Sequence, residues 1–204
     1  MAKQSAKQPE KQPEKQPEKQ PEMPGEEELV DALHQAVGAA VSDLLRERPD
    51  HHFSYWVLVT TGEAFGPALS AWSLEALAEA TAGWPEEAVL DLKWSYADSP
   101  FCTWGEEHLK PVRALFDARP QVFDLEDDEG DKEYELRLRA METALARLDA
   151  EGLFGTGKRR LATVIDIEVP SEEPDRERTF RLNPPEALTG WLADQAALTA
   201  RTAR

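Results

Sequence analysis

The sequence lacks the features that stabilise small secreted proteins or place proteins in membranes. It contains a single cysteine, Cys102, among 204 residues, so an intrachain disulfide is excluded. A lone thiol is typical of a reducing compartment, and we therefore expect a cytoplasmic protein. The longest apolar runs fall far short of a membrane span, and the amino terminus has no apolar segment of the kind found in signal peptides. We expect neither a membrane segment nor a signal sequence.

Basic residues are also scarce. The formal net charge is −17, and residues 25–204 hold 18 basic against 36 acidic side chains. A protein that binds nucleic acid needs a basic surface that displaces counterions from phosphates, so this balance argues against nucleic-acid binding. It is compatible with a basic protein partner, and it also favours solubility.

The amino-terminal segment has almost nothing apolar. Residues 7–22 are four copies of Lys-Gln-Pro-Glu, and proline at every fourth position prevents a continuous helix. We interpret residues 1–25 as a disordered tail and residues 26–204 as one α+β domain. With 41% hydrophobic residues and six tryptophans, the chain is long enough for a buried core.

Hydrophobic periodicity predicts the elements of that domain. Helices are expected over 26–48, 73–82, 104–118 and about 131–150, with a last helix capped by Asn183 and begun by Pro184. Strands are expected over 53–60, 64–71, 89–96 and 161–169, and Pro67 places the second of these at a sheet edge. A polar loop is expected from Pro170 to about Arg178. Because helices and strands do not alternate strictly, we predict a mixed or antiparallel sheet of about four to five strands packed by helices.

A glycine-rich junction links the clearest helix pattern to the clearest strand pattern. Residues 152–159, Gly-Leu-Phe-Gly-Thr-Gly-Lys-Arg, nearly match a phosphate-binding loop. That loop must follow a strand and open a helix, and here the order is reversed; Arg159 also replaces the hydroxyl that would reach Mg²⁺. We therefore interpret Gly152 and Gly155 as the residues that end the helix and reverse the chain, with Phe154 docked on the core. The basic run over 158–160 is then a solvated approach to the strand.

No pattern in the sequence identifies a catalytic or metal centre. His51 and His52 are adjacent, and neighbouring side chains on a strand point to opposite faces. Cys102 has no recognisable partner residues, and a buried structural thiol is the simpler interpretation. We predict no catalytic residues, no metal and no cofactor.

The most acidic stretch lies over 124–135, with eight acidic residues against Lys132. It lacks the ligand spacing of an EF-hand. We interpret its first part as a mobile acidic loop and as a candidate surface for a basic partner. The candidate partner-binding residues are Glu126, Asp127, Asp128, Glu129 and Asp131.

Three segments together resemble one family. They are 94–100 (Trp-Ser-Tyr-Ala-Asp-Ser-Pro), 148–155 (Leu-Asp-Ala-Glu-Gly-Leu-Phe-Gly) and 182–184 (Leu-Asn-Pro). In this order and spacing the chain resembles the bacterial domain-of-unknown-function family 4303. The resemblance implies a single α+β domain without an established activity, and it suggests the immunity proteins of bacterial toxin systems, many of which are small and acidic. It supplies no catalytic residues.

Charge, the missing catalytic pattern and the resemblance lead to one functional hypothesis. We expect a non-enzymatic, immunity-like protein that neutralises a basic toxin domain. The alternative is a small-ligand-binding protein or small enzyme with a pocket at the sheet end, near His51, His52 and Asp98, joined by Arg159 or Arg160.

Overall fold

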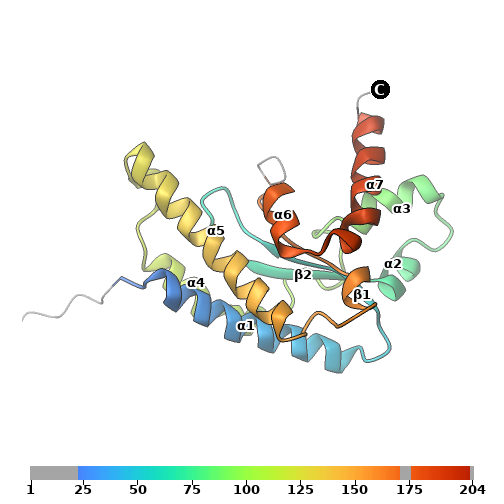
Figure 1. Cartoon of the computed structure of the whole chain (residues 1–204), viewed down its shortest axis with the longest axis horizontal. Coiled ribbons are helices and arrows are strands. Elements are labelled where there is room, and N and C mark those ends of the chain that lie inside the picture. Colours follow the sequence, from blue (N-terminus) through green and yellow to red (C-terminus); the bar gives the residue numbers. More distant parts are fainter. Residues whose placement is uncertain (1–22, 171–175, 203–204) are drawn as a thin grey trace, which may run out of the picture.

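The computed structural model describes residues 23–170 and 176–202, which form helices around a three-stranded sheet (Figure 1). In chain order the elements are α1 (Glu26–Glu47), β1 (Phe53–Val59), β2 (Ala68–Ser73), α2 (Leu74–Ala80), α3 (Glu86–Lys93), α4 (Glu106–Asp117), η1 (Val122–Asp124), α5 (Asp127–Ala150), η2 (Arg160–Ala162), β3 (Val164–Glu168), α6 (Arg176–Leu182) and α7 (Pro185–Thr202). The helix-rich α+β class matches the sequence prediction. The prediction of a disordered tail falls largely on residues outside the described part of the chain.

The sheet is mixed, one of the two predicted arrangements, but it has three strands in the described residues rather than the expected four to five. Its order is β2-β1-β3, with β1 antiparallel to β2 and parallel to β3. The central strand β1 is apolar on both faces and is buried on both faces, as its sequence indicates. The strand β2 does lie at an edge. It begins after Pro67, later than the predicted residue 64, because a turn that includes Ala64 at a positive φ of 49° precedes it.

The helices α1 and α5 lie side by side and run in the same direction (Figure 1). Gly38 permits this approach, since a Cβ there would come within 3.2 Å of Leu148. The apolar stripe of α1 is buried along its whole length. At the solvent side, Arg147 of α5 pairs with Glu27 and Asp31 of α1.

Both faces of the sheet are covered. On one face Trp56 packs against Phe154, which follows α5, with ring centroids 5.8 Å apart. On the other face Tyr55 meets the edge of Trp94, which follows α3, at 5.3 Å. The helices α6 and α7 also lie on this second side, where Thr179 of α6 bonds to Asp166 of β3. The second side therefore joins residues from distant parts of the chain.

The predicted strand over 89–96 is wrong, because residues 86–93 form α3. The alternation of Leu90, Leu92 and Trp94 suggested a strand, but Val89 and Leu92 are three residues apart and both pack on the core, as helical spacing also allows. Short apolar runs are ambiguous in this way. Pro85 followed by two glutamates is a helix start that outweighs the alternation.

The acidic run over 124–135 is a helix start and not a loop. The helix α5 begins at Asp127, four residues before the predicted position, with Glu126 in extended conformation before it. Acidic side chains in the first turn interact favourably with the positive end of the helix dipole, so Asp127, Asp128 and Glu129 help to fix this end.

The carboxyl-terminal part also differs from the prediction. The strand β3 is shorter than 161–169, because residues 160–162 form the 3₁₀ turn η2. The predicted loop to about Arg178 ends earlier, since α6 begins at Arg176; residues 171–175 lie outside the described chain. The helix α7 begins at Pro185, so Asn183 is not its N-cap and Pro184 is not its first residue. Among the described helices, none has the length and apolar content needed to cross a bilayer.

Candidate functional site

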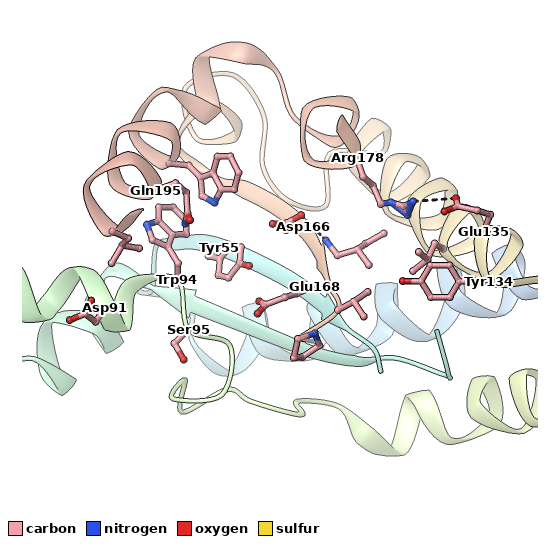
Figure 2. Close-up of a pocket in the computed structure, with 16 residues that line it drawn as sticks. Tyr55, Asp91, Trp94, Ser95, Tyr134, Glu135, Asp166, Glu168, Arg178 and Gln195 are labelled. Atoms are coloured by element: carbon pink, nitrogen blue, oxygen red, sulfur yellow. Dashed lines mark hydrogen bonds and ion pairs between the residues drawn. The ribbon is translucent and has the colours of Figure 1, made fainter. Parts of the chain in front are cut away.

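A cavity of about 340 Å³ opens beside the carboxyl end of β3, between α5, α6, α7 and the segment after α3 (Figure 2). Four aromatic side chains line it: Tyr55, Trp94, Tyr134 and Trp191. Four carboxylates line it as well: Asp91, Glu135, Asp166 and Glu168. The basic side chain in this lining is Arg178, so the formal charge of the wall is strongly negative.

Strand geometry places the two acids of β3 on the same side. Side chains two residues apart share a face of a strand, so Asp166 and Glu168 both follow Val164 on the face toward Tyr55. The parallel register pairs Tyr55 with Val164 and Val59 with Glu168, which brings the aromatic ring and the two carboxylates to one region.

The carboxylate of Asp166 is buried and fixed by hydrogen bonds. It is 8% exposed, and its Oδ1 accepts hydrogen bonds from the Thr179 hydroxyl and from the Ile167 backbone N–H, each at 2.9 Å. These donors satisfy a buried charge that would otherwise be costly. Asp166 therefore links β3 to α6.

Glu168 is in a different state. It is half-buried, and burial raises the pKa of its carboxyl. Across residues 23–170 and 176–202, no hydrogen-bond donor or cation contacts its side chain. Figure 2 shows this carboxylate projecting between Tyr55 and Ser95. A half-buried carboxylate without a donor is the least satisfied acid in the cavity wall.

The aromatic wall is fixed in place. The Trp94 indole N–H donates to Asp194 of α7 at 3.1 Å, and Trp191 is 4% exposed. The pKa of Tyr55 is raised well above its ordinary value, first by burial and then by the charges of Asp166 and Glu168. At neutral pH its hydroxyl is therefore protonated and can donate a hydrogen bond.

Arg178 is buried and lies among acids of α5. Its guanidinium is 3.5 Å from Glu135 and 3.8 Å from Glu142, and the Glu135 contact is drawn in Figure 2. Glu142 also accepts from Arg181 at 2.6 Å. The arginine thus joins α6 to α5 at one end of the cavity.

All five predicted partner-binding residues, Glu126, Asp127, Asp128, Glu129 and Asp131, are exposed at the amino-terminal end of α5. The structure brings them together because one helix carries them. Asp128, Asp131 and Glu135 follow spacings of three and four residues, so they share one face of α5. We name these three residues the acidic ridge; it runs from the exposed end of α5 to the cavity wall.

The glycine junction has the geometry that its sequence predicts. Gly152 has φ +81°, the Gly152 N–H bonds to the Asp149 carbonyl, and the Leu153 N–H bonds to the Leu148 carbonyl. These bonds satisfy carbonyls at the end of α5. Gly155 has φ +109°, and Phe154 is 4% exposed. Between Gly152 and β3 the described residues form no α-helix, since the junction leads through η2 into β3.

The basic run over 158–160 is not simply solvated. Arg160 is 8% exposed and bonds to Asp149 at the end of α5, to the Thr163 carbonyl and to the Leu182 carbonyl. It therefore holds together α5, β3 and α6. The partners of Arg160 are distant along the chain and no sequence pattern reveals them. The sequence therefore predicted a surface residue here.

Asn183 has a different role from the predicted helix cap. Its side chain accepts from the Ile165 N–H at 2.8 Å and donates to the Ile165 carbonyl at 2.6 Å and the Thr179 carbonyl at 2.9 Å. It thereby occupies the free edge of β3 as a neighbouring strand would. Pro184 follows it and accepts a bond from Ala187 at the start of α7.

The residues of the alternative pocket, His51, His52 and Asp98, have local partners in the structure. His51 contacts Ser73, His52 pairs with Glu75, and Asp98 accepts from Ser95. Arg159 reaches the His51 carbonyl. His51, His52, Asp98 and Arg159 are not among the residues that line the cavity of Figure 2.

Sequence reasoning missed the residues that do line the cavity, Tyr55, Asp166 and Glu168 among them. The available signal was the pair of acids in β3, within a strand that is otherwise apolar. It also missed Asp43, Glu107 and His108, whose ligand atoms lie within 4.8 Å of one another. Asp43 already pairs with Arg46 and His108, so the local contacts account for this group without a metal.

Comparison with protein families finds a match over most of the chain. The family model described as "Domain of unknown function (DUF4303)" matches residues 33–184, which is more than half of the chain. Comparison with curated proteins gives no match, and comparison with solved structures gives none.

Proposed function

We infer the function of this chain from its own site, because the chain belongs to the DUF4303 family, whose description names no activity. We propose that it is a non-enzymatic protein-binding domain that takes up a basic segment of a partner protein along α5. The acidic ridge is the observation that carries this proposal, because it connects the exposed acids to a cavity rich in carboxylates.

The charge of the whole chain supports a basic partner. A net charge of −17 creates a field that attracts positive segments and speeds their association more than it increases affinity. Phe123 is 77% exposed just before α5, and an exposed aromatic beside a charged surface is a common contact residue in interfaces. The acids stand on a helix, so little ordering is needed on binding.

An immunity role is the finer form of this proposal. A toxin domain with a basic surface would be the partner, and the chain would neutralise it by covering that surface. The neighbouring reading frame tests this form: a large secreted protein with a variable carboxyl-terminal toxin domain supports it, and an operon of metabolic enzymes contradicts it.

The acidic ridge can be tested with a defined probe. A ten-residue peptide of alternating lysine and glycine is mixed with the protein in stopped flow between 20 and 300 mM NaCl. Replacing Asp128 and Asp131 by asparagine should reduce the association rate at low salt about three- to tenfold and flatten its salt dependence.

Glu47 and Glu79 provide the matched control, because they are exposed and lie on other helices. The E47Q/E79Q variant removes the same charge and should bind the peptide nearly as fast as the natural protein. Equal slowing in both double variants would show that net charge alone acts, and the ridge proposal would then fail.

The cavity favours a second candidate, a small-ligand-binding protein or small enzyme. The observation is that Tyr55, Asp166 and Glu168 meet in a concave site with a volume of about 340 Å³, within the range of ligand pockets. A thermal-shift screen of cationic, anionic and neutral small molecules tests it. A ligand that raises the melting temperature and changes the Trp94 or Trp191 NMR signals supports it; a screen without such a ligand overturns it.

A further inference from the structure

We propose that the cavity binds the head of an organic cation, a guanidinium or alkylammonium group, with the Glu168 carboxylate as its counter-ion and Tyr55 and Trp94 as its wall. The proposal gives the second candidate function a ligand class and rests on it. It does not depend on the exposed acids of α5.

The partners of the four cavity carboxylates single out Glu168. Asp91 pairs with Arg201 at 2.7 Å, and Glu135 pairs with Arg178. Asp166 accepts from the Thr179 hydroxyl and a backbone N–H. Within the described chain Glu168 is the cavity carboxylate whose side chain receives no such contact.

The burial of the Glu168 carboxylate favours a positively charged ligand. A charge moved out of water is destabilised unless a donor or an opposite charge meets it, and the raised pKa of Glu168 reflects this environment. A cation in the cavity would supply the missing interaction. An anion would instead face Glu168 and Asp166, so the wall selects for positive charge.

The aromatic residues favour an organic cation over a hydrated metal ion. The face of an aromatic ring attracts a cation electrostatically, and alkylammonium and guanidinium groups also bury apolar surface against it. Trp94 already shows this interaction, because the Lys93 ammonium lies 4.9 Å from its ring centroid. Tyr55 stands edge-on to Trp94, and its protonated hydroxyl lies within the field of Glu168.

The size of the cavity suits one such group and a short chain. Its volume of about 340 Å³ is near the lower limit of small-molecule pockets, so a single side chain or a small amine fits it. The same chemistry can come from a free metabolite-like amine or from an arginine or lysine of a partner protein. Two kinds of probe distinguish these sources.

The experiment uses n-butylguanidinium and n-butylammonium as free cations, with n-butylurea as the neutral match of the first. Binding to the full chain is followed at pH 7 through the indole N–H signals of Trp94 and Trp191. Charge-assisted hydrogen bonds contribute about 1.5–3 kcal/mol, so E168Q should weaken cation binding roughly ten- to hundredfold. E47Q should leave it unchanged.

Each outcome decides the proposal. Saturable shifts with a cation, absent with butylurea and lost in E168Q, support it. Equal binding of butylurea, equal binding by E168Q, or no shift with either cation at 50 mM would overturn it. A blocked Gly-Gly-Arg-Gly-Gly peptide that binds at least as tightly as butylguanidinium identifies a protein side chain as the source, whereas weaker peptide binding identifies a free cation.

The variant with both Asp128 and Asp131 replaced by asparagine separates this proposal from the acidic-ridge proposal. Asp128→Asn/Asp131→Asn retains Glu168 and should bind butylguanidinium normally even if it loses its fast association with the basic peptide. One proposal can therefore fail in these experiments while the other is supported.

Discussion

Glu133 shows how single residues of α5 divide between surface and core. It is 7% exposed and lies between Arg119 and Arg137, which are 6% and 0% exposed. The distances are 2.5 Å from Arg119 Nη2 and 2.8 Å from Arg137 Nε. Burial alone would raise the pKa of Glu133, but hydrogen bonds from both arginines outweigh it and the pKa is lowered. Its neighbours Asp128, Glu129 and Asp131 are exposed to solvent, whereas Glu135 pairs with the buried Arg178.

Replacing Glu133 by glutamine should destabilise the protein strongly. The change leaves two buried guanidinium groups without their negative charge, and breaking a buried pair costs about 3–5 kcal/mol. Urea unfolding at pH 7 measures the loss. A lowered pKa stabilises the fold above the ordinary value of 4.5, and this stabilisation disappears as the pH falls below it. The difference from the natural protein should therefore shrink in acid.

Glu129 is the control for that change, since it lies one turn earlier on α5 and is exposed. Its replacement by glutamine should alter the free energy of unfolding by less than about 1 kcal/mol, the upper range of a dipole contribution. Similar losses of unfolding free energy in both variants would mean that the ion pairs of Glu133 with Arg119 and Arg137 stabilise the fold no more than an exposed acid does.

Close approach of elements depends on individual glycines, and Gly105 is the clearest case. It precedes α4 with φ +66°, and a Cβ there would lie 2.5 Å from the Ala40 Cβ of α1. The Trp104 indole N–H donates to the Ala40 carbonyl at the same place. The contact between α1 and α4 therefore requires a residue without a side chain.

Gly105→Ala should combine backbone strain with a steric clash. Gly83 has φ +82° and nothing within 4 Å of its added Cβ, so Gly83→Ala reports strain alone, about 1 kcal/mol. We expect Gly105→Ala to cost about 1–3 kcal/mol more than Gly83→Ala in urea unfolding, because overpacking adds to strain. Equal effects of the two changes would contradict a clash at Ala40.

The Asn183 side chain at the edge of β3 gives a second test of how one residue joins two elements. Asn183→Asp keeps the shape and the acceptor toward the Ile165 N–H, but it removes the donors to the carbonyls of Ile165 and Thr179. A buried carboxylate facing two carbonyls should cost about 2–3 kcal/mol in the free energy of unfolding. Hydrogen exchange at β3 should rise more than exchange in α1. A variant as stable as the natural protein would show that the side chain is not needed at this edge.

Periodicity predicted elements where a long pattern left one interpretation. The apolar stripes of α1 and α5 and the strand β1, which is apolar on both faces, are readable from the sequence. The short helix α3 is not, because eight residues fit both periods. The helix α6 has few apolar residues, and its stability comes from distant contacts such as Thr179 with Asp166.

The site was less predictable than the fold. The cavity joins side chains from β1, α3, α5, β3, α6 and α7, and no local pattern shows that these converge. The family segments contribute indirectly: Trp94 lines the cavity, whereas Asn183 and Gly152 hold β3 and α5 in place. The exposed acids of α5 were identified from sequence, and their partner role stays a prediction.

At the scale of the whole molecule, acid titration has two opposite effects. Glu168 has a raised pKa, so the folded state binds its proton more readily than the unfolded chain and stability rises as the pH falls toward 4.5. The pKa of Glu75 is lowered to about 2, because bonds from the His52 backbone and ring outweigh its burial. The stabilisation that Glu75 and Glu133 give to the fold is therefore lost as the pH falls below 4.5.

The stability of the natural protein should consequently pass through a maximum slightly above pH 4.5. Glu168→Gln supplies the neutral form at every pH, so this variant should be more stable than the natural protein at pH 7 and equal to it near pH 4.5. Urea midpoints between pH 7.5 and 3 measure both curves, with E47Q as the control that should follow the natural protein. If E168Q and the natural protein run parallel across this range, Glu168 is fully solvated, and the cavity then has no unsatisfied charge to offer a cation.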